Sequence, residues 1–387
     1  MKRYARTLLV GSIVLLRLCI DICGLGVLAF LLFVNRWSRL SADPTWSPDG
    51  EKIAFICHRP TLSRVLEDKG SSLFNCGYIS DAFEICTIKP DGRGFVRLTK
   101  NQEADLNPAW SPDGQWIAYV SGGALQFLKE DGSQSQSLQL DEGVFARELI
   151  WSPDGKRLGF TAGVNLYVAT LEDRTIRALT TLPGDEFDAA WSPDSTRMSF
   201  TRDSSGVGKF YDHGDTIWIV DMEGRLESVD LMVPEFEDIG MPSWNPEGTQ
   251  LAFWGYRRDD DDSTRGYNEV WLTEVYTVDL ETGEVRCLTE GYDLDVKRWA
   301  AWTPDGARIA FTADEALYTV LPDGTDLTQI ALFDQPMDGY TLYNHDFTWA
   351  PGGKYLALLR FIEGDMSKDR IWVVEMEEGR MWELRVP

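Results

Sequence analysis

Carboxylates are the side chains with the greatest capacity for chemistry in this 387-residue sequence, which holds 62 acidic residues and three histidines. His58, His213 and His345 lie far apart in the sequence, so few histidines are present to form a catalytic triad or a histidine-based metal site. No Gly-x-Ser-x-Gly segment, the nucleophile turn of α/β-hydrolases, occurs. Carboxylate pairs that could cleave a glycosidic bond are inevitable among so many acids. Hydrolysis by carboxylates is therefore an alternative, and we predict no individual catalytic residue.

A run of four aspartates at residues 259–262 is the best candidate for a metal site. The run lacks the alternating spacing, the Gly and the Glu of a calcium-binding EF-hand loop. Arg257, Arg258 and Arg265 lie around it and favour a solvated charged segment. We expect no bound metal and no cofactor.

Another set of charged residues stands a few positions before a recurring tryptophan. The set is mostly acidic, and in a closed ring of repeats it would surround the mouth of a central channel, where it could receive a cationic group or a basic peptide. A solvated rim is an equally ordinary interpretation. The candidate binding residues are Asp105, Arg147, Glu148, Glu186, Asp188, Glu237, Asp238, Asp295, Lys297, Arg298, His345 and Asp346.

The recurring tryptophan opens a segment of the type Trp-Ser-Pro-Asp-Gly. In this segment Pro presets its own φ, Ser and Asp can bond nearby backbone, and Gly accepts a positive φ, so the pattern predicts a tight turn between two antiparallel strands. Seven copies occur, beginning at Trp46, Trp110, Trp151, Trp191, Trp244, Trp302 and Trp349.

Short apolar strands recur between the copies, for example at residues 52–55, 165–168 and 370–374. Each unit contains four such strands with no helical pattern between them. We therefore predict an all-β fold, a β-propeller of seven blades over residues 44–387, with six blades as the alternative. Residues 39–41 have a sequence similar to that of residues 97–99, so a strand from the start of this region could close the ring beside the last blade.

The seven segments resemble the WD40-like Pro-Asp repeats of the TolB-like propeller family, and the resemblance covers residues 44–387. It implies the fold and says little of function, because unrelated activities share this scaffold. TolB itself resembles a six-bladed propeller behind a small α/β domain, so a role in the Tol envelope system is not implied. The repeats are also similar to the propellers of prolyl-oligopeptidase and dipeptidyl-peptidase enzymes, whose hydrolase domain we expect to be absent.

Strand order predicts which connections share a face of the propeller. The Trp-Ser-Pro-Asp-Gly turns and the third-to-fourth-strand turns lie together on one side and are short; we call this the plain face. The opposite, loop-rich face receives the long insertions at residues 59–80, 202–215, 256–269 and 362–369. Binding usually resides in elaborated loops on a rigid scaffold, so we expect the loop-rich face to bind.

An almost wholly apolar segment at residues 7–34 exceeds the roughly 20 residues that a membrane-spanning helix needs. Arg17 and Asp21 interrupt it four residues apart, where they could neutralise each other. We predict an N-terminal transmembrane helix acting as an uncleaved signal anchor, after a cytoplasmic tail at residues 1–6 and before a linker at residues 35–43. A cleaved signal peptide is the alternative.

Three cationic side chains and the terminal amine precede this segment, and two cationic side chains follow it. This excess favours an N-terminus inside the cell. We therefore predict a single-pass membrane protein with an extracytoplasmic propeller, periplasmic or extracellular. Disulfides form in such compartments. Cys57 and Cys76 are the pair that we predict to be bonded.

Net charge is −25, and residues 1–43 carry six cationic against two acidic side chains, so the rest of the chain carries −29. So acidic a surface repels phosphate backbones, which disfavours nucleic-acid binding, and it would steer a basic partner. We expect a non-catalytic, membrane-anchored scaffold that binds a protein partner. A receptor for a small ligand, a sugar or a peptide, and a hydrolase using carboxylates of the loop-rich face are the alternatives.

Overall fold

The computed structural model describes residues 44–58, 83–132, 135–141, 144–181, 183–203, 214–229, 236–257, 273–294, 297–313, 316–333, 342–362 and 370–384. These residues form 28 β-strands and no helix. The predicted membrane anchor, its tail and its linker lie outside the described residues. Within these ranges, no helix is long and apolar enough to cross a bilayer.

The strands come in groups of four. The first group is β1 (Thr45–Trp46), β2 (Ile53–His58), β3 (Phe83–Ile88) and β4 (Val96–Arg97). The second is β5 (Leu106–Trp110), β6 (Ile117–Ser121), β7 (Ala124–Leu128) and β8 (Ser135–Gln139). The third is β9 (Ala146–Trp151), β10 (Arg157–Ala162), β11 (Asn165–Thr170) and β12 (Thr175–Ala178). The fourth is β13 (Asp185–Trp191), β14 (Arg197–Asp203), β15 (Thr216–Asp221) and β16 (Leu226–Ser228).

Three more groups complete the series. The fifth is β17 (Phe236–Trp244), β18 (Gln250–Arg257), β19 (Thr273–Asp279) and β20 (Val285–Cys287). The sixth is β21 (Lys297–Trp302), β22 (Ile309–Ala313), β23 (Ala316–Val320) and β24 (Thr328–Leu332). The seventh is β25 (Leu342–Trp349), β26 (Tyr355–Ile362), β27 (Arg370–Glu375) and β28 (Met381–Glu383).

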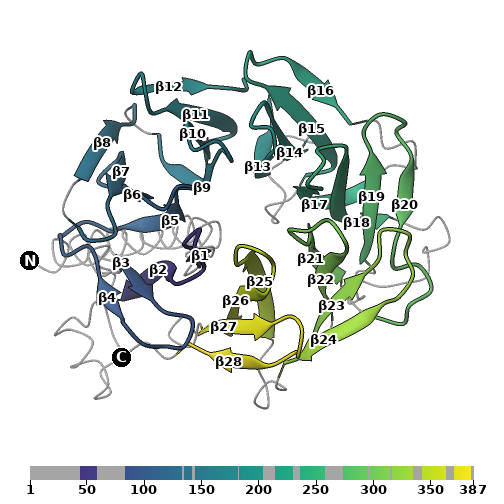
Figure 1. The fold of residues 1–387 in the computed structure, drawn as a ribbon. Helices are drawn as coiled ribbons and strands as arrows, with labels where there is room; N and C mark the ends of the chain where they lie inside the picture. Colours follow the sequence, from purple (N-terminus) through teal and green to yellow (C-terminus); the bar gives the residue numbers. More distant parts are fainter. Residues whose placement is uncertain are drawn as a thin grey trace, which may run out of the picture. The chain divides into compact units, whose positions relative to one another are not determined.

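Each group forms its own four-stranded antiparallel sheet with the strands in chain order, and the seven sheets are the blades of a propeller (Figure 1). The first strand of every blade, from β1 to β25, lies nearest the centre, and the fourth lies at the rim. The prediction of an all-β, seven-bladed propeller is confirmed, and the six-bladed alternative is wrong.

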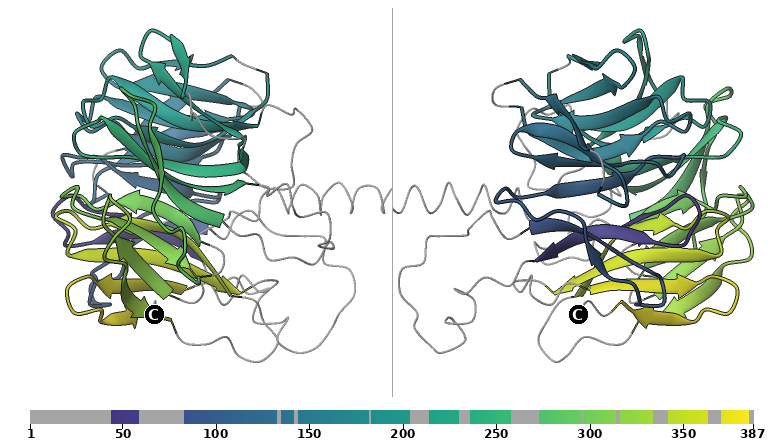
Figure 2. Two further views of the ribbon diagram at one scale, coloured as in Figure 1. Left: turned by 90° about the vertical axis from the view of Figure 1, so that its right-hand side faces the viewer. Right: turned by 60° about the vertical axis from the view of Figure 1, so that its left-hand side comes forward.

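The core of the propeller lies between blades, with one hydrophobic cluster at each of the seven interfaces. Because side chains alternate along a strand, neighbouring residues pack against different blades. Phe55 packs against blade 7, whereas the adjacent Ala54 packs against blade 2. The second strands are therefore apolar on both faces, and side views show the blades stacked face to face (Figure 2).

Blades 1 and 7 close the ring through their side chains. The Trp46 indole nitrogen donates to the Thr348 carbonyl at 3.1 Å, and that of Trp382 donates to the Pro90 carbonyl at 2.7 Å. The rings of Trp46 and Tyr355 stack with centroids 6.4 Å apart. The strand that we predicted at residues 39–41 lies outside the described residues.

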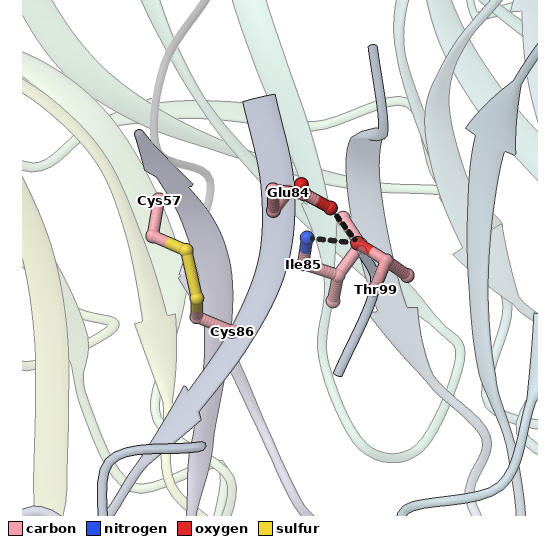
Figure 3. Close-up of a disulfide and its surroundings, with 5 residues drawn as sticks. All are labelled: Cys57, Glu84, Ile85, Cys86 and Thr99. Carbon is pink, nitrogen blue, oxygen red and sulfur yellow. Dashed lines mark hydrogen bonds between the residues drawn. A yellow bond between two sulfur atoms is a disulfide. The ribbon is translucent and has the colours of Figure 1, made fainter. Parts of the chain in front are cut away.

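A disulfide joins Cys57 of β2 to Cys86 of β3 (Figure 3). The predicted bond between Cys57 and Cys76 is therefore wrong, and Cys76 itself lies outside the described residues. The cause is the strand register, in which Cys57 lies opposite Glu84 and Cys86 lies opposite Phe55. This diagonal relation leaves the two Cα atoms 5.9 Å apart, within the range that a disulfide spans.

Candidate functional site

The two faces of the ring differ as predicted in the length of their connections. Because neighbouring strands are antiparallel, all second-to-third-strand connections leave the loop-rich face. Those of blades 2 and 3 have two residues each, at 122–123 and 163–164. The connections of blades 1, 4, 5 and 7 are long, running over residues 59–82, 204–215, 258–272 and 363–369.

On the plain face, six of the seven repeat turns are held by their own side chains, and the exception is the last copy, which has Ala350 and Gly352 in place of Ser and Asp. In the first copy, the Ser47 hydroxyl donates to the Asp49 carboxylate at 2.6 Å and accepts the backbone N–H of Lys52 at 2.9 Å. The hydroxyl bond lowers the pKa of Asp49, and of Asp194 and Asp305 in the same way, because it stabilises the ionised carboxylate. The acidic residues of these turns are therefore part of the turn structure.

The same turns also bind the preceding blade. A Cβ placed on Gly114, whose φ is 70°, would lie 3.2 Å from Cγ of Pro48 in blade 1. Glycine suits both this backbone conformation, which side chains rarely adopt, and this close contact. Blade 4 has Ser195 in place of the glycine, and its hydroxyl accepts the backbone N–H of Asp154 in blade 3 at 3.0 Å. Equivalent glycine–proline contacts join Gly155 to Pro112, Gly248 to Pro193, Gly306 to Pro246, Gly353 to Pro304 and Gly50 to Pro351.

The repeat tryptophans add a second set of contacts between blades. Four indole nitrogens donate to the carbonyl one residue before the tryptophan of the preceding blade, at 3.0 to 3.2 Å. We call these indole bonds and the glycine–proline contacts together the turn belt. The repeat motif is thus used to hold the ring together, which fits its prediction as a structural element. The bonds run from Trp46 to Thr348, Trp151 to Ala109, Trp191 to Ile150 and Trp244 to Ala190.

The first strands of the blades share a β-bulge that sequence reasoning missed. In blades 2 to 6, two residues oppose one on the second strand, and the first of the two has a positive φ. A bulge of this kind changes the direction of a side chain. The position lies three residues before the tryptophan and is occupied by Asn107, Glu148, Asp188, Met241 and Trp299. The sequence signal for the bulge was its constant spacing of three residues before the tryptophan, but the residue type at this position varies.

Three predicted site residues stand two positions before the bulge and are buried between blades. Asp105 is 0% exposed and accepts two bonds from the Asn101 amide at 2.9 and 3.0 Å. Glu186 is 2% exposed, and burial raises its pKa to about 7. Lys297 is 1% exposed and donates to Glu274 at 3.2 Å. The structure therefore places these three inside the protein, whereas we predicted them at the channel mouth.

A threonine explains how the Glu186 carboxylate is accommodated. The hydroxyl of Thr180 accepts the N–H of Leu166 at 2.9 Å and donates to Glu186, which also accepts that N–H at 2.8 Å. In blade 1, Thr99 accepts the Ile85 N–H and donates to Glu84 of the same blade (Figure 3). In blade 5, Thr289 makes the same pair of bonds with Val275 and Glu274. Leu-Thr pairs at residues 98–99, 179–180 and 288–289 are the sequence signal for it.

The other predicted residues are dispersed. Arg147 donates to the Gly163 carbonyl at 3.2 Å, and the Arg298 guanidinium lies 5.8 Å from the centre of the Trp254 ring. The Glu148 carboxylate accepts the Thr161 hydroxyl at 3.4 Å. Asp238 lies on β17 opposite Tyr256. Asp295 and the side chains of Glu237, His345 and Asp346 lie outside the described part of the protein.

A cavity of about 400 Å³ lies on the channel side of blades 4 to 7. Its walls are three short stretches of first strands, residues 188–191, 241–244 and 299–301, together with Phe347, Pro153 and Pro193. The two prolines belong to plain-face turns, so this channel cavity occupies the plain-face half of the channel. Asp188 is the predicted site residue that lines it.

Comparison with known proteins agrees with this geometry. A family model described as the TolB beta propeller domain matches residues 77–216, a range that includes β3 to β14. The predicted resemblance to TolB-like propellers is thereby confirmed. The chain is also similar to an oligogalacturonate lyase solved in complex with manganese, with a TM-score of 0.57 at 14% identity over 86% of this chain and 88% of that chain. At this identity the likeness shows the fold alone.

Two relatives are similar in sequence. An uncharacterized peptidase, YuxL, of Bacillus subtilis is 27% identical over 232 residues, which are 58% of this chain and 31% of that protein. Dipeptidyl-peptidase 5 of Porphyromonas gingivalis is 24% identical over 321 residues, which are 78% of this chain and 43% of that protein. The chain thus spans less than half the length of either relative.

Proposed function

This chain is a TolB-like β-propeller of seven blades, and we propose that it acts as a non-catalytic scaffold that binds a protein partner at its loop-rich face. In this proposal residues 7–34 anchor the chain in a membrane, and the propeller lies on the outer, extracytoplasmic side.

The observation that carries the proposal is the contrast between the two faces. On the plain face, the residues of the repeat motif form the contacts between blades that make up the turn belt, and the connections between strands are short. All four long connections leave the opposite face from blades that the belt holds in place. Long loops on a rigid scaffold are a common way to build a binding surface.

Charge and compartment add support. A net charge of −25 favours association with a basic partner, because opposite potentials steer two proteins together. The Cys57–Cys86 disulfide fits an oxidising compartment outside the cytoplasm. Both sequence relatives carry the name of a peptidase, but the match covers less than half of each, so we do not extend peptidase activity to this chain.

Crosslinking in native membranes followed by affinity purification tests the scaffold. The variant to compare replaces residues 257–272 by Gly-Gly, the connection that blade 2 uses at residues 122–123. A two-residue turn is compatible with the strand register of blade 5, because Tyr256 pairs with Thr273 in the same way as Ser121 pairs with Ala124 across the two-residue turn of blade 2. The exposed plain-face variant Glu281→Gln serves as the control. We expect a partner that the wild type and the control retain and the loop variant loses.

Repeated recovery of the bait alone would count against the scaffold, as would a partner that the loop variant retains while Glu281→Gln loses it. Protease added to intact cells checks the topology, because an extracytoplasmic propeller is accessible to it and a cytoplasmic one is protected.

A receptor for a small ligand is the second candidate, and the channel cavity favours it. Its volume falls within the range of about 300 to 1,000 Å³ that small-molecule sites occupy. A panel of sugars and short peptides should then contain a compound that raises the melting temperature of the full chain. A panel without any shift would argue against such ligands.

A further inference from the structure

We propose that the channel cavity binds a compact organic cation, an ammonium or guanidinium group carried on an aromatic or aliphatic body. The site lies in the plain-face half of the channel, so it is independent of partner docking at the loop-rich face. It rests on the receptor candidate above and gives that receptor a ligand class.

Space for the ligand comes from two pairs of alanines. Ala189 with Ala190, and Ala300 with Ala301, fill the two positions before the tryptophans of blades 4 and 6. Blade 3 has Leu149 and Ile150 at the same positions. Four residues that line the cavity therefore carry methyl groups where blade 3 carries large apolar side chains.

Asp188 supplies negative charge to the cavity wall. The bulge holds this residue at a φ of 53°, and its carboxylate accepts the backbone N–H of Met241 at 3.1 Å and the Thr201 hydroxyl at 3.4 Å. A carboxylate has two oxygens with about four acceptor positions, so it can take part in several hydrogen bonds at once. The positioned carboxylate selects a cation over a neutral molecule of the same shape.

Large apolar side chains face the same space. Trp299 and Met241, both at bulge positions, line the cavity together with Phe347. Aromatic faces attract cations, and they also cover the apolar body of a ligand. A carboxylate and aromatic rings around one small cavity are the combination that recognises an organic cation.

An interruption of the turn belt coincides with the cavity. By the pattern of the other blades, Trp302 and Trp349 would donate to the carbonyls of Ser243 and Ala301, but both indole nitrogens are buried and have no hydrogen-bond partner among the described residues. Ser243 and Ala301 both line the cavity. Trp110 lacks its bond as well, away from this site. Carbonyls that do not receive the indole can accept a ligand N–H.

Calorimetric titration of the full chain with benzylamine and with benzyl alcohol tests the proposal, since the two probes differ chiefly in charge. We expect benzylamine to bind about tenfold more tightly than benzyl alcohol, the ratio that one charge-assisted contact provides. Asp188→Asn keeps an oxygen for the Met241 N–H and removes the charge, so it should abolish the preference. Ala301→Ile introduces the residue that blade 3 carries at this position, and it should abolish binding of both probes.

Asp91→Asn, the same chemical change at an exposed plain-face turn, is the matched control and should retain the wild-type preference. Melting curves of all variants establish that each one folds. Equal affinity for the two probes, no binding of either, or a preference that survives Asp188→Asn would each overturn the proposal. Loss of the protein partner in the loop variant, measured separately, would leave this result unchanged.

Discussion

Buried charge recurs at one position of the blades, five residues before the tryptophan. Asp105, Glu186 and Lys297 occupy it in blades 2, 4 and 6, and each finds polar partners between two blades. Burial raises the pKa of Glu186 from 4.5 to about 7, so its protonation falls in the physiological range.

Stability should therefore fall as the pH rises through this window. Between about pH 4.5 and 7 the folded protein holds a proton on Glu186 that the unfolded chain releases, so unfolding is favoured as the pH increases. Relative to Glu186→Gln, the wild type should lose roughly 3 kcal/mol of unfolding free energy over this range. Melting temperatures of both proteins across the range measure the effect. Parallel profiles would contradict it, and Glu377→Gln, an exposed change, should give a profile parallel to that of the wild type.

The burial of these residues could not be predicted from charge alone. Their position before each tryptophan suggested a ring around the channel, but the spacing does not reveal the buried partners: Asn101 for Asp105, Thr180 for Glu186 and Glu274 for Lys297. Asp188, two residues after Glu186, is the first residue of a bulge and lines the cavity. A bulge depends on the pairing of two strands, which the residue types of one strand do not specify.

At the scale of elements, the β2–β3 hairpin of blade 1 combines the longest connection with the disulfide. Cys57 and Cys86 close a loop of 29 residues at the end of the hairpin. Sequence proximity favoured Cys76, whereas the register of the two strands decides the pairing. That register follows from which side chains of β2 and β3 face blade 7, so the correct bond becomes visible only with the blade assembled.

Removal of this bond should destabilise the protein. In the chain-entropy model a loop of this length contributes roughly 3 to 4 kcal/mol. Cys86→Ala should therefore lower the melting temperature under non-reducing conditions by several degrees, and Cys76→Ala should leave it unchanged. Under reducing conditions the wild type and Cys86→Ala should converge. A drop for Cys76→Ala with none for Cys86→Ala would show that the other pairing holds.

For the whole molecule, the sequence motif predicted most of the architecture. Seven tryptophan turns gave the number of blades, and the short strands between them gave the order of the sheets and the assignment of loops to faces. The side-chain contacts that join blades 1 and 7 could not be predicted, because those of Trp46 with Thr348 and of Trp382 with Pro90 join residues about 300 positions apart. No local pattern specifies a contact at such a separation.

The interface between blades 7 and 1 should open first. Within the described residues it is joined by side chains and by no backbone link, so its separation stretches no connection. Hydrogen exchange should therefore be faster in β1 and β25 than in β9 and β13. Trp46→Phe should accelerate exchange at this interface alone, whereas Trp191→Phe should act between blades 3 and 4. Uniform exchange around the ring would contradict this order.

The four indole bonds of the turn belt all point the same way around the ring: those of blades 3, 4 and 5 run to the blade before them in the chain, and that of blade 1 runs to blade 7. The ring consequently has a rotational sense, although its blades are alike. Replacing one of these four tryptophans removes the indole bond that its own blade donates, and it leaves intact any indole bond that this blade receives. At these four blades, the two interfaces of one blade therefore respond differently to replacement of its tryptophan: the interface that receives the indole bond is weakened directly, and the other is not.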